Sequence, residues 1–238
     1  MNKIICLWSS PRNISTALMY SFAQRKDTKV FDEPLYAHYL RSSGARHPGR
    51  EKILGVLENN GNKVVKEVIL QKSKKMLFHK LMTHFLTDLD DNFLSTVCNI
   101  LFIRDPEKII HSYSKVIQNP KMKDIGIKQQ YELYVNLKER GCSPIVLDSS
   151  SLLKDPELIL RRLCVLLGIP FDINMLRWNK GGRKEDGVWA KYWYKNVHNS
   201  TGFVNYNSQK HRLKKGYAKL ARECMPYYEF LINKAIIL

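Results

Sequence analysis

The sequence predicts an α/β fold with a central parallel sheet flanked by helices, and two observations support this prediction. Short apolar runs, each closed by a polar turn, alternate with longer segments of helical periodicity. Strands that are apolar along most of their length are typical of a parallel sheet covered on both faces. The chain of 238 residues is long enough for one such domain and short for two, so we expect a single domain over residues 1–238.

The alternation predicts particular strands and helices. Strands are expected at residues 3–8, 76–81, 97–103 and 144–147, with a further strand ending near Glu33. Helices are expected at residues 15–25, 106–117, 128–140 and 156–167. The second of these helices has an apolar stripe, with Asp105 as its N-cap and Pro106 in its first turn.

Two stretches have weaker patterns. Residues 41–75 are basic and polar, and are interpreted either as helices over an open sheet edge or as a lid over a substrate site. Residues 179–206 combine glycines with aromatic residues, which predicts a long ordered loop before a last helix near residues 209–232. The aromatic residues of this loop could line a substrate pocket or stack on a nucleotide base, although such clusters more often pack a loop onto the body of the protein.

The composition describes a basic globular protein. Hydrophobic residues make up 44% of the chain and charged residues 26%, which excludes a disordered chain. The net charge of +17 predicts a field that gathers anions, such as nucleic acid, a membrane surface or an anionic nucleotide. Lysines spread over solvated faces would give the same total, so the charge alone does not select a function.

The sequence favours a cytoplasmic location. Five cysteines lie far apart without a C-x-x-C pair, as expected of buried thiols in a reducing compartment. The apolar run at the start of the chain is too short for a signal peptide. No run reaches the length of a membrane span, so we expect no membrane-spanning segment.

A first candidate anion site lies at residues 7–16, L-W-S-S-P-R-N-I-S-T, where a predicted strand breaks into a tight loop that opens a helix. A helix N-terminus offers unpaired N–H groups and the positive end of the helix dipole, so the loop with Arg12 and neighbouring hydroxyls can seat an anion. It lacks the G-x-x-x-x-G-K-[ST] pattern of nucleoside-triphosphate loops. Taken alone, it could be an ordinary helix cap at Ser15 or Thr16.

A second strand end repeats this arrangement at residues 100–112, I-L-F-I-R-D-P-E-K-I-I-H-S. Arg104 leaves the carboxyl end of a strand where a helix begins, and Ser112 follows eight residues later. Ligands of open α/β sheets lie at the carboxyl ends of the strands. The sequence therefore predicts two anion sites at one edge of the sheet.

Together these loops resemble the two phosphate-binding signatures of sulfotransferases that use 3'-phosphoadenosine-5'-phosphosulfate (PAPS). The resemblance extends to D-E-P-L-Y-A-H at residues 32–38, to residues 147–157 and 163–171, and to G-G-R-K at residues 181–184. It is strongest to soluble sulfotransferase-like proteins with S-P-R-N-x-S-T and D-E-P-L-Y-A-H. It implies a P-loop-like three-layer domain with PAPS as co-substrate and no metal.

The resemblance also assigns residues to the nucleotide. It implies that the 5'-phosphosulfate is held by Arg12, Asn13, Ser15 and Thr16. It implies that the 3'-phosphate is held by Arg104 and Ser112, with Arg183 and Lys184 closing over it. One position departs from the pattern: many relatives have glycine where this chain has Ile14, and a β-branched residue gives the loop less freedom to wrap an anion.

Sulfuryl transfer needs positive charge at the bridging oxygen and a base for the acceptor proton. Arg12 is the candidate for the charge, and Lys80 could assist the leaving phosphate or simply be solvated. Two residues are candidates for the base: Glu33, by resemblance to glycan- and tyrosine-directed enzymes, and His84, by resemblance to the small-molecule branch. We favour Glu33, although either residue could be an ordinary loop residue.

The expected function is transfer of a sulfuryl group from PAPS to a hydroxyl or amine of a small molecule or glycan. One alternative is a basic nucleic-acid-binding module, which the charge and the interleaved aromatic residues would suit but for which no specific recognition motif is found. Another is a relative that binds PAPS or its product without turnover, for which Ile14 is the indication.

Overall fold

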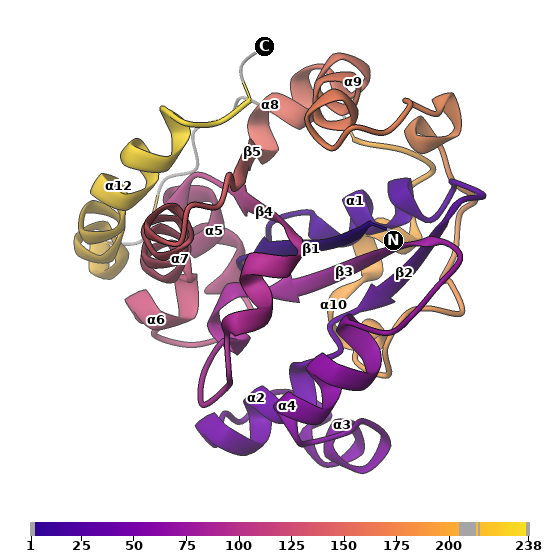
Figure 1. Ribbon diagram of the computed structural model, residues 1–238. Coiled ribbons are helices and arrows are strands. Elements are labelled where there is room, and N and C mark those ends of the chain that lie inside the picture. Colours follow the sequence, from indigo (N-terminus) through magenta and orange to yellow (C-terminus); the bar gives the residue numbers. More distant parts are fainter. Residues whose placement is uncertain (1–2, 205–212, 214, 237–238) are drawn as a thin grey trace.

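The computed structural model describes residues 3–204, 213 and 215–236. Five parallel strands form one sheet in the order β2-β3-β1-β4-β5 (Figure 1). The strands are Ile4–Ser9 (β1), Thr28–Asp32 (β2), Met76–Met82 (β3), Cys98–Ile103 (β4) and Ile145–Asp148 (β5). The chain crosses from one side of β1 to the other between β3 and β4, so the topological switch point, where ligands bind in such sheets, lies beside β1.

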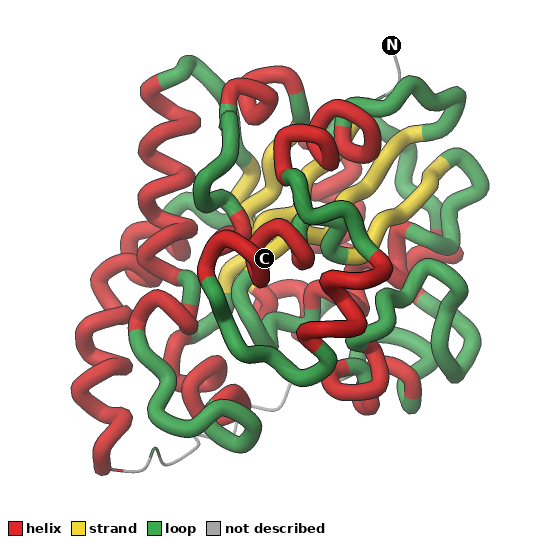
Figure 2. The backbone as a smooth tube through the Cα atoms, turned by 90° about the horizontal axis from the view of Figure 1, so that it is seen from below, coloured by secondary structure: helices red, strands yellow, loops and turns green. Residues whose placement is uncertain are grey.

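Helices cover both faces of the sheet (Figure 2). They are Ser15–Phe22 (α1), Tyr36–Ser43 (α2), Arg50–Val56 (α3), Gly61–Val64 (α4), Pro106–Tyr113 (α5), Met122–Ile125 (α6), Ile127–Glu139 (α7), Ser149–Lys154 (α8), Pro156–Leu166 (α9), Ala190–Trp193 (α10), Lys195–His198 (α11) and Ala218–Ile232 (α12). A π-helical turn at Val65–Ile69 follows α4, and 3₁₀ turns lie at Thr83–Phe85, Asn92–Thr96, Ile173–Leu176 and Lys215–Tyr217.

Strand β1 separates two hydrophobic cores because successive side chains of a strand point to opposite faces. Ile5 and Leu7 pack into a core with α1 and α9. Cys6 and Trp8 pack into a second core with α2, α5, α7 and α12. The result is the predicted three-layer α/β arrangement.

Most of the predicted elements are confirmed, including the strand before Glu33 and the Asp105 cap, whose carboxylate accepts from the Glu107 N–H at 2.8 Å. The prediction of a helix to residue 117 is wrong, because α5 ends at Tyr113. Only the first part of the apolar stripe is buried, and Val116 is 47% exposed. A left-handed residue, Asn119, then turns the chain.

The weakly patterned stretches contain more helix than expected. Residues 41–75 hold the end of α2, then α3, α4 and the π-helical turn, which confirms the helical interpretation of this region. The expected loop at residues 179–206 contains the short helices α10 and α11. The last helix is α12, and residues 205–212 and 214, where we expected it to begin, lie outside the described residues.

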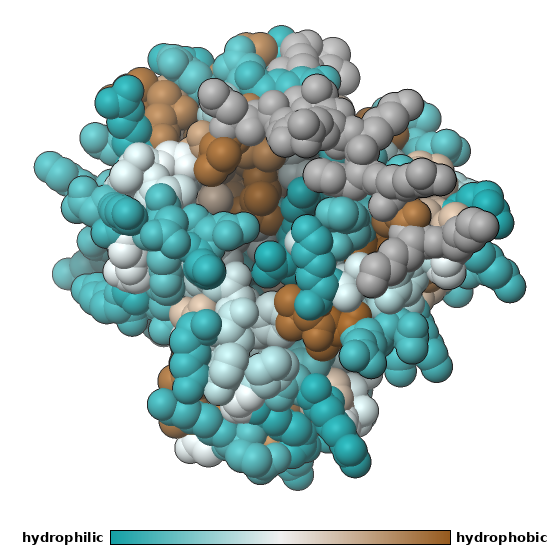
Figure 3. Space-filling view, turned by 180° about the vertical axis from the view of Figure 1, so that it is seen from behind, coloured by the Kyte–Doolittle hydropathy of each residue, from teal (hydrophilic) through white to brown (hydrophobic). Residues whose placement is uncertain are grey.

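The described surface is largely hydrophilic. On the face in Figure 3, hydrophilic side chains predominate and apolar patches are small and separate. Across the part of the chain that the structure describes, no helix combines the length and apolar character that crossing a bilayer requires.

Candidate active site

The strand ends meet at one cavity of about 610 Å³ beside the switch point. Its walls come from the segments that follow all five strands, as expected of a ligand site in an open α/β sheet. Nine residues singled out in the sequence line this cavity: Arg12, Asn13, Ser15, Thr16, Glu33, Lys80, His84, Arg104 and Ser112.

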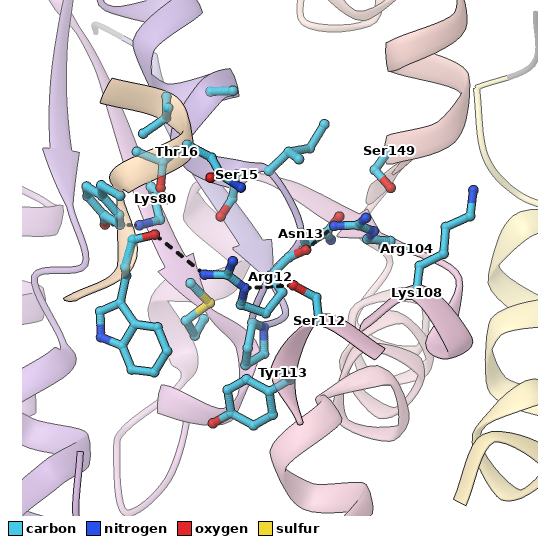
Figure 4. Close-up of a pocket in the computed structure, with 18 of the residues that line it drawn as sticks. Arg12, Asn13, Ser15, Thr16, Lys80, Arg104, Lys108, Ser112, Tyr113 and Ser149 are labelled. Carbon is cyan, nitrogen blue, oxygen red and sulfur yellow. Dashed lines mark hydrogen bonds between the residues drawn. The ribbon is translucent and has the colours of Figure 1, made fainter. Parts of the chain in front are cut away.

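Arg12 and Arg104 converge in this cavity, as the resemblance requires (Figure 4). Arg104 donates a hydrogen bond to the backbone carbonyl of Arg12, and Arg12 Nε donates to Ser112 Oγ at 3.0 Å. Burial lowers the pKa of both guanidiniums, and the charge of Arg12 lowers the pKa of Arg104 further. Two partly buried cations held together favour an anionic ligand, because the ligand relieves their repulsion.

The loop after β1 wraps around the start of α1 with a left-handed backbone. Arg12 has φ 60° and Ile14 has φ 47°, a region that favours glycine. Ser15 and Thr16 open the helix beside the cavity, where their side chains join the free N–H groups of the first turn (Figure 4). Ile14 therefore adopts the backbone that a glycine would take there, and the loop closes despite the bulkier side chain.

This strained position gives a first testable prediction. Ile14→Gly and Ile14→Ala remove nearly the same packing, but only alanine retains the cost of a left-handed backbone. We expect the glycine variant to be more stable than the alanine variant by about 1 kcal/mol, measured by urea unfolding. At Ala17, inside α1, the order should reverse, with Ala17→Gly losing about 0.5–1 kcal/mol. A more stable alanine at position 14 would contradict the assigned backbone.

A buried ion cluster lies at the ends of β2 and β3. Asp32 and Lys80 are paired in register across the two strands, and Lys80 Nζ lies 2.8 Å from Asp32 Oδ1 and 2.5 Å from Glu33 Oε1. The side chains of Lys80 and Asp32 are 1% and 0% exposed. The Lys80 ammonium thus pairs with two carboxylates. The cluster carries a net negative charge unless one of the carboxylates holds a proton.

The two carboxylates differ in their other partners. Asp32 accepts from the Tyr194 hydroxyl at 2.8 Å and from the Gly187 N–H at 3.0 Å. The same hydroxyl also accepts from Lys80 Nζ. Glu33 has a more distant contact with Tyr194, at 3.5 Å, and it lines the cavity. Asp32 is therefore the anchored carboxylate, and Glu33 is the one presented to a ligand.

Burial raises the pKa of Glu33, and Asp32 raises it further while Lys80 opposes the rise. Burial alone would lower the pKa of Lys80, but the two carboxylates outweigh it, so the ammonium stays charged. Glu33 also has a left-handed backbone with φ 45°, which is uncommon outside functional sites. A carboxylate whose pKa is raised toward neutrality is well suited to accept a proton.

His84 lines the same cavity in a different environment. Its ring contacts Tyr39, with centroids 4.7 Å apart, and Phe85, with centroids 4.9 Å apart. Burial lowers the pKa of His84 to about 3, and the charge of His47 contributes to the shift. The imidazole is therefore neutral at physiological pH and a weak base.

Arg183 and Lys184, the basic residues of the G-G-R-K segment, are not among the described residues that line the cavity. Arg183 Nε lies 3.2 Å from Glu185, the Arg183 backbone N–H donates to Asp186, and its guanidinium lies over the Tyr20 ring.

The structure adds residues that sequence reasoning did not select. Ser149 follows β5 at the start of α8 and lines the cavity near Arg104 (Figure 4). Lys108 and Tyr113 reach it from α5. Ser149 could have been found from the rule that identified Arg104, because it lies two residues after the predicted strand at residues 144–147.

Comparison with known proteins places this fold and site in a family. A model of the sulfotransferase domain matches residues 2–235. The chain therefore belongs to the sulfotransferase family, with the α/β architecture described above.

Two curated relatives are similar in sequence. Branched-chain-amino-acid aminotransferase-like protein 1 of Arabidopsis thaliana is 41% identical over 231 residues, and branched-chain-amino-acid aminotransferase-like protein 2 of the same organism is 37% identical over 233 residues. Each match covers 96% of this chain and 41% of the relative, so the chain spans about two fifths of their length.

Solved structures share the fold at low sequence identity. The sulfotransferase domain of the Synechococcus PCC 7002 olefin synthase has a TM-score of 0.60 at 18% identity, over 97% of this chain and 94% of that one. A sulfotransferase from Alicyclobacillus acidocaldarius has a TM-score of 0.60 at 11% identity, over 99% and 98%.

Proposed function

We propose that the protein transfers a sulfuryl group from PAPS to a hydroxyl or amine of a small molecule or glycan, in the cytoplasm and without a metal. The convergence of Arg12 and Arg104 on one cavity carries this proposal, because PAPS presents two separated anionic groups on one adenosine. Family membership supports the reaction class.

In this proposal, the two anionic ends of PAPS occupy two parts of the cavity. Arg104 and Ser112 bind the 3'-phosphate, with Ser149 beside them. The phosphosulfate lies at the start of α1, between Arg12 and Lys80. A charged guanidinium and ammonium there stabilise the negative charge that develops on the bridging oxygen as its bond to sulfur breaks.

Glu33 serves as the base in this scheme. It faces the cavity beside Lys80, and its raised pKa brings it closer to the pH at which it works. The three hydrogen bonds that Asp32 accepts hold that neighbouring carboxylate in place and leave Glu33 as the one that faces the cavity. His84, with its pKa lowered by burial, is the weaker candidate.

A nucleotide titration tests the proposal. Adenosine 3',5'-bisphosphate at 100 times its Kd should stabilise the protein by about 2.7 kcal/mol, which raises Tm by about 5–10 °C for a chain of this length. Adenosine 5'-monophosphate, which lacks the 3'-phosphate, should give a clearly smaller shift. In Arg104→Ala the difference between the two nucleotides should shrink, because the cation that binds the 3'-phosphate is gone while Ser112 and Ser149 remain.

Arg41→Ala is the matched control, since it removes the same charge from an exposed position on α2 and should leave both shifts unchanged. Equal shifts for the two nucleotides in the unmodified protein would count against a 3'-phosphate site at Arg104 and Ser112. Salt-sensitive binding of random oligonucleotides without any response to the bisphosphate would favour the nucleic-acid-binding alternative instead.

A further inference from the structure

The cavity has two halves of different chemistry, on either side of Arg12. One half contains the hydroxyls and cations described above. Figure 4 shows Tyr113 on the other side of Arg12 from Ser15 and Thr16. Six of the ring-bearing residues that line the cavity form what we call the aromatic compartment: Tyr36, His47, His84, Phe85, Tyr113 and Trp193.

The rings of the aromatic compartment support one another. Tyr36 stacks on Phe85 with centroids 5.3 Å apart and an angle of 14°, and Phe85 meets His84 edge-on at 4.9 Å. The ring centroids of His47 and Trp193 are 6.5 Å apart, and His47 Nδ1 lies 2.7 Å from the Tyr36 hydroxyl. The compartment is thus preformed, and a ligand that fits it loses little binding energy to rearrangement.

The aromatic compartment is also uncharged. The formally charged side chains that line the cavity within the described residues are Arg12, Glu33, Lys80, Arg104 and Lys108. The first four are assigned to the nucleotide or to the transfer itself, and Lys108 lies on the Arg104 side of the cavity (Figure 4). Burial lowers the pKa of both His47 and His84, which keeps the imidazoles neutral. The six residues of the compartment therefore offer an acceptor ring contacts, and none of them offers a formal charge for an ion pair.

We infer that the acceptor is a flat, uncharged aromatic alcohol of the phenol class, an inference that rests on the proposed function. Ring faces and edges bind another ring well, whereas a glycan brings many hydroxyls that each need a partner. The Tyr36 hydroxyl and His47 Nδ1 already satisfy each other. The phenol class thus fits the compartment better than a glycan.

The reaction balances with these groups. The phenolic oxygen attacks sulfur and forms the new S–O bond while its proton passes to Glu33. The bond between sulfur and the bridging oxygen breaks, and its electron pair stays on adenosine 3',5'-bisphosphate, beside Arg12 and Lys80. The products are an aryl sulfate and the bisphosphate, and Glu33 later releases its proton to water.

Calorimetric titration of three alcohols onto the protein saturated with adenosine 3',5'-bisphosphate tests the inference. The probes are 2-naphthol, its saturated analogue decahydro-2-naphthol, and methyl glucoside. We expect 2-naphthol to bind roughly 2- to 12-fold more tightly than the saturated alcohol, which is the range of aromatic pair energies. Methyl glucoside should bind more weakly than both.

A pair of variants tests whether the aromatic compartment is the binding site. Trp193→Leu should weaken 2-naphthol binding by roughly 2- to 12-fold and raise KM for it, with the affinity for the bisphosphate unchanged. Tyr192→Leu is the matched control, because Tyr192 is 42% exposed, adjacent in sequence and not part of the cavity wall. It should bind 2-naphthol like the unmodified protein.

The outcomes separate this inference from the proposed function. Tighter binding of methyl glucoside than of 2-naphthol, or equal effects of the two variants, would overturn the inference while leaving nucleotide binding intact. Absence of bisphosphate binding would overturn the proposed function instead. In that case, 2-naphthol titrated onto the nucleotide-free protein still tests the compartment, and no difference between Trp193→Leu and the unmodified protein would reject it.

Discussion

Replacing Lys80 by methionine should lower the free energy of unfolding by about 3–5 kcal/mol, the usual cost of removing one partner from a buried ion pair. Methionine has a similar size, so the loss reflects charge rather than volume. Asp32 and Glu33 would remain buried without their cation. Urea unfolding at pH 7 measures the loss, and a change below 1 kcal/mol would contradict the assigned cluster.

The pH dependence of the stability loss in Lys80→Met shows whether the unpaired carboxylates cause it. Burial already raises the folded-state pKa of Glu33, and without Lys80 nothing opposes that rise. Stability contributed by a raised pKa is present at low pH and lost as pH rises, so the deficit of Lys80→Met should shrink between pH 7 and pH 5. Lys29→Met, an exposed lysine on β2, serves as the control and should cost less than about 0.5 kcal/mol at either pH.

Replacing Glu33 by glutamine should lower kcat by about 10²- to 10⁴-fold, the usual contribution of a general base. Glutamine keeps the shape of the side chain and its contact with Lys80 but accepts no proton. The melting-temperature shift with adenosine 3',5'-bisphosphate should persist, because the nucleotide contacts are retained. In the unmodified enzyme, kcat/KM should rise with pH through the raised pKa of Glu33, since the ionised form is the active one.

His84→Gln is the comparison variant for this experiment. It removes the second candidate base, and we expect a loss of less than about tenfold, because an imidazole with a pKa near 3 contributes little basicity at neutral pH. If His84→Gln abolishes turnover while Glu33→Gln retains it, the assignment of the base is reversed.

The sequence predicts the sheet and the anion loops for the same physical reason. Strands buried on both faces are continuous apolar runs, and a polar loop that follows such a run must lie at the carboxyl edge of a parallel sheet. This is why Arg12 and Arg104, 92 residues apart, could be expected in one cavity. The helices of residues 41–75 were only weakly predicted, because basic and polar residues dilute their apolar periodicity.

The ion cluster is not readable from the sequence. Lys80 lies within an apolar strand, and its role depends on the pairing of β2 with β3 and on Tyr194, which reaches Asp32 from a segment 162 residues away. Such long-range contacts leave no local pattern. The sequence could therefore suggest Glu33 and His84 as candidate bases, and the contrast between their environments had to come from the packing around each of them.

A crystal structure with bound adenosine 3',5'-bisphosphate tests the central claim most directly. The account predicts one nucleotide in the cavity beside β1, with its 3'-phosphate on Arg104 and Ser112 and its 5'-phosphate at the start of α1, within hydrogen-bond distance of Arg12. A nucleotide bound elsewhere, or one whose phosphates contact neither guanidinium, would contradict it.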